Sequence, residues 1–180
     1  RSALTVMKLD GTARRVVYQL TGNRGDVSSP AFSPNGRQLA FEVVSSGFSQ
    51  RPHTRAVFVV GVDGSGLRRL TPWKESSGDH PTWSPDGRWI LFHTHVEDSG
   101  AQAQYAVVHP DGTGRKTISS FPSGTSVASA GFSPDGTSIV LSKGPEGGNV
   151  DVWTMRLDGS GLTRITRSAR WESAPDWARG

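Results

Sequence analysis

Three short segments of the chain are apolar at consecutive positions rather than at every second position. They are Leu39-Ala40-Phe41, Ile90-Leu91-Phe92 and Ile139-Val140-Leu141. A strand with one face in water alternates apolar and polar side chains, so runs of this kind predict strands that are buried on both faces. Each run follows a turn sequence, which favours short strands over helices.

The turn before each apolar run is repeated along the chain. Ser-Pro-Asn-Gly at 33–36 returns as Ser-Pro-Asp-Gly at 84–87 and 133–136. A truncated fourth copy at 174–177 contains only the residues that precede this turn, and it ends at Trp177 in the place of Phe32. Asp86 follows Asn35 by 51 residues, and Asp135 follows Asp86 by 49. Pro sets φ for the first turn position, Asp or Asn bonds to its own backbone, and Gly takes the positive φ. Each complete copy therefore predicts a hairpin.

A second turn interleaves with the first. Asp-Gly followed by Ser or Thr begins at Asp10, Asp63, Asp111 and Asp158, in steps of 53, 48 and 47 residues. One period then contains four predicted strands, for example at 82–83, 89–93, 105–109 and 115–119. Four-stranded antiparallel units of this length, stacked on their neighbours, are typical of β-propeller blades. Helix should be nearly absent.

The sequence therefore predicts an all-β chain, a β-propeller or propeller segment of four-stranded antiparallel blades. Two strands of a partial blade occupy 1–27, three complete blades occupy 28–72, 73–120 and 121–167, and the first strand of a further blade occupies 168–180. Closure of a ring would bring Trp177 into contact with the strand that holds Val6 and Leu9, from the same chain or from a second copy. We expect the natural parent to be longer, with about six to eight blades.

Composition narrows the class of protein further. The chain has 180 residues with 34% hydrophobic residues, 22 Gly and 11 Pro, and its six Trp and seven Phe argue against disorder. There is no Cys, which excludes disulfides and Cys-based zinc sites. No apolar run approaches about 18 residues, and no signal peptide is visible. The chain does not begin with Met, so we expect a mature, trimmed or excised piece.

The net charge of +4 is a feature that nucleic-acid-binding proteins share, so nucleic acid has to be considered as a partner. The basic residues, however, start the fourth strand of each repeat: Arg14, Arg15, Arg68, Arg69, Arg115, Lys116 and Arg164. Charge on an outer strand discourages edge-to-edge pairing, and the repeat spreads it around a rim. We predict no nucleic-acid partner, no membrane insertion and no cofactor.

The motifs also carry a family resemblance. One motif is Ser-Pro-Asp-Gly before an apolar strand, and the other is Asp-Gly-Ser-Gly-Leu-x-Arg-Leu/Ile-Thr at 63–71 and 158–166. Together they resemble the TolB-like, WD-type propeller repeat over the whole chain. This resemblance implies a bacterial protein, with a periplasmic or secreted location favoured. Similar repeats occur in TolB, in tricorn-type proteases, in prolyl oligopeptidase relatives and in oligogalacturonate lyases, so the resemblance implies a fold more than an activity.

Variable segments mark a candidate binding face. The loops after the second strands (45–55, 96–103 and 144–149) and after the fourth strands (22–29, 73–80, 120–129 and 168–173) differ in length and chemistry, unlike the turns. The alternative is relaxed constraint on surface loops. The candidate binding residues on this face are Asp79, His80, His95, Glu97, Asp98, His53, Trp73, Trp171 and Glu172.

Two groups among these have competing interpretations. His93 and His95 share one strand face near Asp79-His80 and could bind a divalent metal, but we expect a packed His93, a solvated His95 and no metal. Trp73 and Trp171 could form a contact patch, although packing between blades is favoured. Phe32, Trp83, Phe132 and Trp177 share one strand position and are predicted to be core.

No Gly-x-Ser-x-Gly elbow, phosphate loop or other standard catalytic motif is present, so no catalytic residue is assigned. The leading hypothesis is a non-catalytic scaffold that binds another protein through the variable face, with self-association possible. The second is an accessory propeller of a larger hydrolase. The third is a carbohydrate-active or carbohydrate-binding propeller with a His-based metal site.

Overall fold

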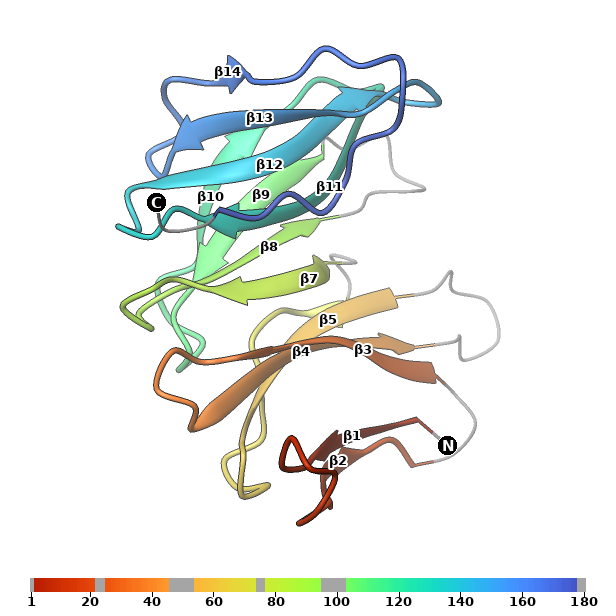
Figure 1. Cartoon of the computed structure of the whole chain (residues 1–180), viewed down its shortest axis with the longest axis vertical. Coiled ribbons are helices and arrows are strands. Elements are labelled where there is room, and N and C mark those ends of the chain that lie inside the picture. Colours follow the sequence, from red (N-terminus) through yellow and green to blue (C-terminus); the bar gives the residue numbers. More distant parts are fainter. Residues whose placement is uncertain (1, 22–24, 46–53, 74–76, 95–102, 178–180) are drawn as a thin grey trace.

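The computed structural model describes residues 2–21, 25–45, 54–73, 77–94 and 103–177. Within these ranges the chain forms fourteen β-strands and no α-helix. The strands make one two-stranded and three four-stranded antiparallel sheets, stacked along the long axis of the molecule (Figure 1). The prediction of an all-β propeller segment is confirmed. The described residues contain no helix with the length and apolar character needed to cross a membrane.

The strands follow the predicted order within each repeat. An N-terminal hairpin consists of β1 (Ala3–Val6) and β2 (Arg15–Gln19). The first sheet consists of β3 (Gly25–Phe32), β4 (Gln38–Ser45), β5 (Thr54–Gly61) and β6 (Arg68–Arg69). The second sheet consists of β7 (Ser77–Trp83), β8 (Ile90–Thr94), β9 (Gln104–Val108) and β10 (Lys116–Ser120). The third sheet consists of β11 (Thr125–Phe132), β12 (Ser138–Pro145), β13 (Asp151–Arg156) and β14 (Thr163–Arg164).

The first strand of each sheet begins earlier than the sequence predicted. β7 starts at Ser77, so Asp79 and His80 lie within a strand and not in a loop before it. Each first strand changes register near its middle, between Ser28 and Ala31 in β3 and at equivalent positions in β7 and β11. This bulge lets the strand continue along its long partner. Because it interrupts the regular alternation of side chains, the first half of the strand was not predicted from the sequence.

Both families of turns form as predicted. Asp86 Oδ1 accepts hydrogen bonds from Ser84 Oγ at 2.6 Å and from the Arg88 backbone N–H at 3.0 Å, and Gly87 has φ of 71°. The same bonds recur at Asn35 and Asp135. In the second family, Asp111 Oδ1 accepts from the backbone N–H and Oγ1 of Thr113, and Asp10, Asp63 and Asp158 repeat this arrangement.

The hydrophobic core lies between neighbouring sheets. β8 is buried along its whole length, which confirms the prediction from its apolar run. Trp83 is 8% exposed, packs between the first and second sheets, and donates its indole N–H to the Ala31 carbonyl at 3.0 Å. Phe132 is buried in the same way between the second and third sheets.

Two of the four predicted core aromatics are instead exposed. Phe32 is 57% exposed and Trp177 is 39% exposed, so their assignment to the core was wrong. Trp83 and Phe132 show that this position packs on the sheet that comes before it. Phe32 is preceded only by the N-terminal hairpin, which corresponds to the last two strands of a repeat and offers no first strand to cover it.

The N-terminal hairpin and the third sheet lie at opposite ends of the stack (Figure 1). The hairpin packs Leu4 and Val17 against the first sheet. Near the other end, the Ala174 backbone N–H donates to Ser129 Oγ at 3.0 Å, so the truncated repeat runs along β11. Contact of Trp177 with the strand that holds Val6 within one chain was therefore a wrong prediction. Completion by a second copy stays a prediction.

Candidate functional site

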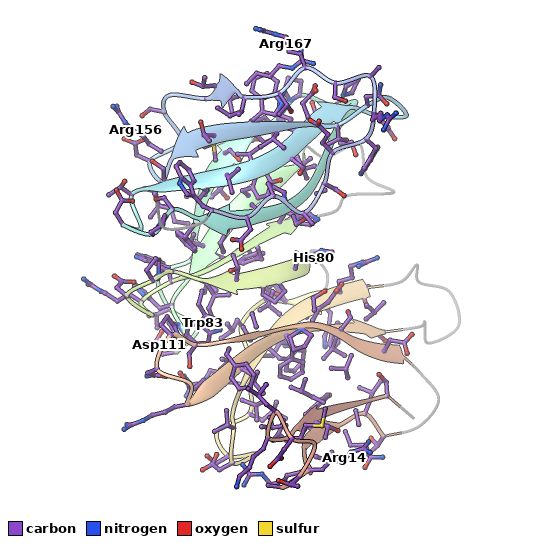
Figure 2. The ribbon with its side chains drawn as sticks, viewed as in Figure 1. Arg14, His80, Trp83, Asp111, Arg156 and Arg167 are labelled. Atoms are coloured by element: carbon purple, nitrogen blue, oxygen red, sulfur yellow. The ribbon has the colours of Figure 1, made fainter. Side chains whose placement is uncertain are left out.

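The sheets have two chemically different sides. The turn side carries the hairpins centred on Asn35, Asp86 and Asp135 and those centred on Asp10, Asp63, Asp111 and Asp158. The loop side carries the opposite ends of the strands, the β12–β13 connection (146–150) and the segment after β14 (165–173) (Figure 1). Asp111 lies on the turn side, whereas His80 lies toward the other end of β7 (Figure 2).

The turn side is uniform in its electrostatics as well as its geometry. A hydrogen bond from the Thr113 hydroxyl, reinforced by the Thr113 backbone N–H, lowers the pKa of Asp111 below its ordinary value. Hydroxyl and backbone donors lower the pKa of the other turn aspartates in the same way: Asp10, Asp63, Asp86, Asp135 and Asp158. Because these hydrogen bonds form within each turn, the structural role of the aspartates is sufficient to explain their lowered pKa values.

The loop side of the second sheet brings two histidines near each other. His80 is exposed and has φ of 50°, while His93 is only 2% exposed on β8. Their rings are nearly parallel, with centroids 6.4 Å apart, and His93 also meets the Tyr105 ring edge-on at 5.9 Å. His93 is therefore a packed residue, as the sequence favoured. In the β7–β8 register, Asp79 lies opposite His93.

The remaining members of the predicted His cluster lie outside the described residues: His53, His95, Glu97 and Asp98. In the ranges that the structure describes, no group of three His, Asp or Glu side chains is placed to hold a metal ion. The assignment of these four residues to the binding face therefore stays a prediction.

The two candidate tryptophans differ in their surroundings. Trp73 packs against the core of the first sheet, 5.7 Å from the Phe58 ring between centroids, with the Arg69 guanidinium over its face. Trp171 is 54% exposed. The backbone N–H of the neighbouring Glu172 donates to the Val150 carbonyl, and the Glu172 carboxylate accepts a hydrogen bond from the Thr166 hydroxyl. Trp171 therefore projects from an anchored segment on the loop side.

One buried polar position recurs in the sheets and was missed in the sequence. Glu42, His93 and Ser142 follow the apolar runs at equivalent places, and each is at most 2% exposed. Glu42 accepts hydrogen bonds from Ser28 Oγ at 2.8 Å and from Arg55 Nη1 at 2.7 Å. Alignment of the three repeats contains this signal, because a polar residue follows each run of three apolar residues.

A second group that the sequence did not identify lies on the loop side of the third sheet. Asp151, 4% exposed, forms an ion pair with Arg164 and accepts the Ser168 backbone N–H at 3.0 Å. Lys143 lies directly opposite Asp151 in the β12–β13 register, and Trp153 is two residues further along β13. The sequence had marked the loops 144–149 and 168–173 beside this group as variable, but it had not identified Lys143, Asp151 or Trp153.

Basic side chains are spread over the molecule. Arg14 lies at one end of the stack of sheets and Arg167 at the other, while Arg156 projects from the turn side of the third sheet (Figure 2). Arg14, Arg68, Arg69, Arg115, Lys116 and Arg164 are all exposed, as expected for residues on outer strands.

Comparison with proteins of known sequence finds relatives of two kinds. It is 29% identical over 158 residues to the Tol-Pal system protein TolB of Francisella tularensis, which covers 83% of this chain and 32% of that protein. It is 29% identical over 110 residues to dipeptidyl-peptidase 5 of Porphyromonas endodontalis, which covers 61% of this chain and 15% of that enzyme. The chain thus spans less than a third of each relative.

Solved structures show the same fold. TolB from Acinetobacter baumannii superposes with a TM-score of 0.68 at 22% identity, over 95% of this chain and 39% of that one. Puromycin hydrolase superposes with a TM-score of 0.70 at 19% identity, over 95% of this chain and 28% of that one. The profile of the TolB β-propeller domain matches residues 1–178. Three stacked four-stranded sheets with recurring Ser-Pro-Asp-Gly turns, together with this match, show that the chain belongs to the TolB β-propeller domain family.

Proposed function

We propose that this propeller segment is non-catalytic and binds another protein through its loop side. The observation that carries the proposal is the contrast between the two sides of the sheets. The turn side repeats one set of contacts in every repeat, whereas the loop side places different side chains at equivalent positions. Surfaces that recognise a partner vary in this way on a constant scaffold.

Two further features support a protein partner. Trp171 exposes an indole on a segment that is anchored by backbone and side-chain hydrogen bonds, and exposed aromatic residues are common anchors in protein interfaces. The relative from Francisella tularensis is named as a protein of the Tol-Pal system, which is consistent with a protein partner.

Site-specific photo-crosslinking tests which side binds. A photoreactive amino acid is placed at Glu146 or Arg170 on the loop side and at Arg37 or Arg88 on the turn side, four exposed positions. In the organism that encodes the protein, we expect discrete crosslinked adducts from the loop-side positions only. Adducts of equal yield from both sides, or from the turn side alone, would contradict the proposal.

An accessory propeller of a larger peptidase is the second candidate. The likeness to dipeptidyl-peptidase 5 over 15% of that enzyme, and to puromycin hydrolase over 28% of that chain, favours it. Sequencing the gene on both sides of this segment separates the two candidates. An α/β-hydrolase region in the same reading frame, with peptidase activity of the full-length product, would decide for the accessory role.

A further inference from the structure

A groove of about 580 Å³ opens at the loop-side end of the third sheet. Its lining includes Thr125, Lys143, Asn149, Asp151, Trp153 and Arg164. Pockets of a few hundred Å³ with a small number of placed polar groups are the usual size for small ligands or for one or two side chains of a partner. All these lining residues lie in the described ranges.

The indole of Trp153 forms part of the lining of the groove. Its N–H donates to the Lys143 carbonyl at 3.0 Å, which fixes the ring against β12. The Lys143 ammonium lies 4.5 Å from the Trp153 ring centroid and 5.3 Å from that of Phe121. Two aromatic faces therefore hold the ammonium in place without neutralising its charge.

The nearest carboxylate is already engaged. Asp151 bonds to the Arg164 guanidinium through one oxygen and to the Ser168 backbone N–H through the other. In the part of the chain that the structure describes, no carboxylate forms an ion pair with Lys143. The described lining therefore carries one net positive charge, on a Lys143 ammonium for which the described residues provide no hydrogen-bond acceptor.

The fold does not require these side chains. At the equivalent register positions, the first sheet pairs Val43 with Ala56, both buried. The second sheet pairs Thr94 with Gln104. Lys143 paired with Asp151 is thus specific to the third sheet, in a position that apolar or neutral residues fill elsewhere. Because the other two sheets fold with apolar or neutral residues at this position, the Lys143 charge is a candidate for recognition.

We propose that this groove binds the side-chain carboxylate of an acidic segment in a partner protein. The Lys143 ammonium donates to the carboxylate, and the face of Trp153 contacts the methylene groups that carry it. A charge-assisted bond of this kind is stronger than a neutral one, and the aromatic wall limits competition from water. This inference rests on the proposed function, because it names an anchor point and a partner chemistry for the loop side.

The test is an NMR titration of the whole 180-residue chain, with the Trp153 indole N–H signal as the readout. The ligand is the capped peptide acetyl-Gly-Glu-Gly-amide, and acetyl-Gly-Gln-Gly-amide is the neutral control. We expect a saturable shift with the first peptide and none with the second. Lys143→Gln should weaken the binding by about tenfold or more, which corresponds to loss of one charge-assisted hydrogen bond.

Lys8→Gln, an exposed lysine next to a turn-side hairpin, is the matched control and should leave the binding unchanged. Equal responses to both peptides, or no effect of Lys143→Gln on a correctly folded protein, would overturn the proposal. A response to glucuronate but not to the acidic peptide would also overturn it. The titration needs no partner protein, so its failure is distinguishable from the absence of loop-side crosslinks.

Discussion

The turn side of the sheets repeats one chemistry, whereas the loop side changes from sheet to sheet. Every turn-side hairpin is held by an Asp or Asn oxygen that accepts bonds from residues at most two positions away. On the loop side, the first sheet has the Glu42–Arg55 ion pair, the second the His80–His93 pair, and the third Asp151 with Arg164. Local bonds set the register, which leaves the opposite strand ends free to differ.

The strongest test of this contrast is removal of the Glu42 carboxylate. Glu42 is 1% exposed and is bonded to Arg55 and Ser28. Glu42→Ala should lower the free energy of unfolding by about 3 kcal/mol, because it removes a buried carboxylate together with its ion pair to Arg55 and its hydrogen bond from Ser28. Urea denaturation followed by tryptophan fluorescence measures the change.

Ser142 provides the matched control at the same position of the third sheet. Its hydroxyl is buried and has no hydrogen-bond partner within the described residues. Ser142→Ala should therefore be neutral or stabilising by up to about 1 kcal/mol. Equal losses from the two substitutions would show that the position has the same role in the first and third sheets, which would contradict a difference between them.

The next effect concerns a bond that joins two sheets. The Tyr105 hydroxyl donates to the Ala128 carbonyl at 2.7 Å, and the same hydroxyl oxygen lies 3.1 Å from the Ser142 carbonyl oxygen. Burial raises the pKa of this phenol, so it remains a donor at every ordinary pH. Tyr105→Phe should cost about 1–2 kcal/mol in thermal or urea unfolding. No loss of stability would mean that apolar packing alone joins the second and third sheets.

Turn-side stability should depend on pH in one direction. The Ser84 hydroxyl, followed by the Arg88 backbone N–H, lowers the pKa of Asp86 from 3.8. A lowered pKa in the folded state stabilises the fold above the ordinary pKa, and this contribution is lost as pH falls through the folded value. Stability should therefore decline below about pH 4, with the other turn aspartates adding to the effect.

Two substitutions separate charge from hydrogen bonding in that turn. Asp86→Asn copies the first sheet, where Asn35 makes the same bonds, and should flatten the pH dependence while keeping most of the stability. Asp86→Ala removes the acceptor and should cost about 0.5–1 kcal/mol at neutral pH. Unfolding free energies measured between pH 3 and pH 7 test both, and an unchanged slope in Asp86→Asn would contradict the assignment.

The smallest effect lies in the turns of the second family. Ala13 has φ of 52°, where the equivalent residues of the other repeats are Gly66, Gly114 and Gly161, with φ between 64° and 68°. Ala13→Gly should stabilise the hairpin by about 0.5 kcal/mol, since relief of the strain exceeds the added freedom of the unfolded chain. Gly66→Ala should lower the free energy of unfolding by about 1 kcal/mol, because it introduces the same strain. The shift in melting temperature measures both changes.

Features that depend on neighbours in the chain followed from the sequence alone. The Ser-Pro-Asp-Gly turn around Asp86 and the Asp-Gly turn at Asp111 close bonds within a few residues, so the residue types determine the geometry. The run at 90–92 likewise predicted burial on both faces, because two neighbouring sheets must cover it. Repetition of these signals was sufficient to identify the propeller.

Features that depend on another sheet were decided only by the tertiary structure. Phe32 and Trp83 occupy the same place in their repeats, yet only Trp83 is buried, because only it has a complete sheet before it. Asp151 and Arg164, 13 residues apart, meet because adjacent strands bring them together. The Lys143 ammonium of the third sheet lies over the ring of Phe121, the residue after β10, because the second and third sheets pack together. Residue types and spacing determine local turns and the burial of a strand, whereas contacts between sheets depend on which neighbour is present.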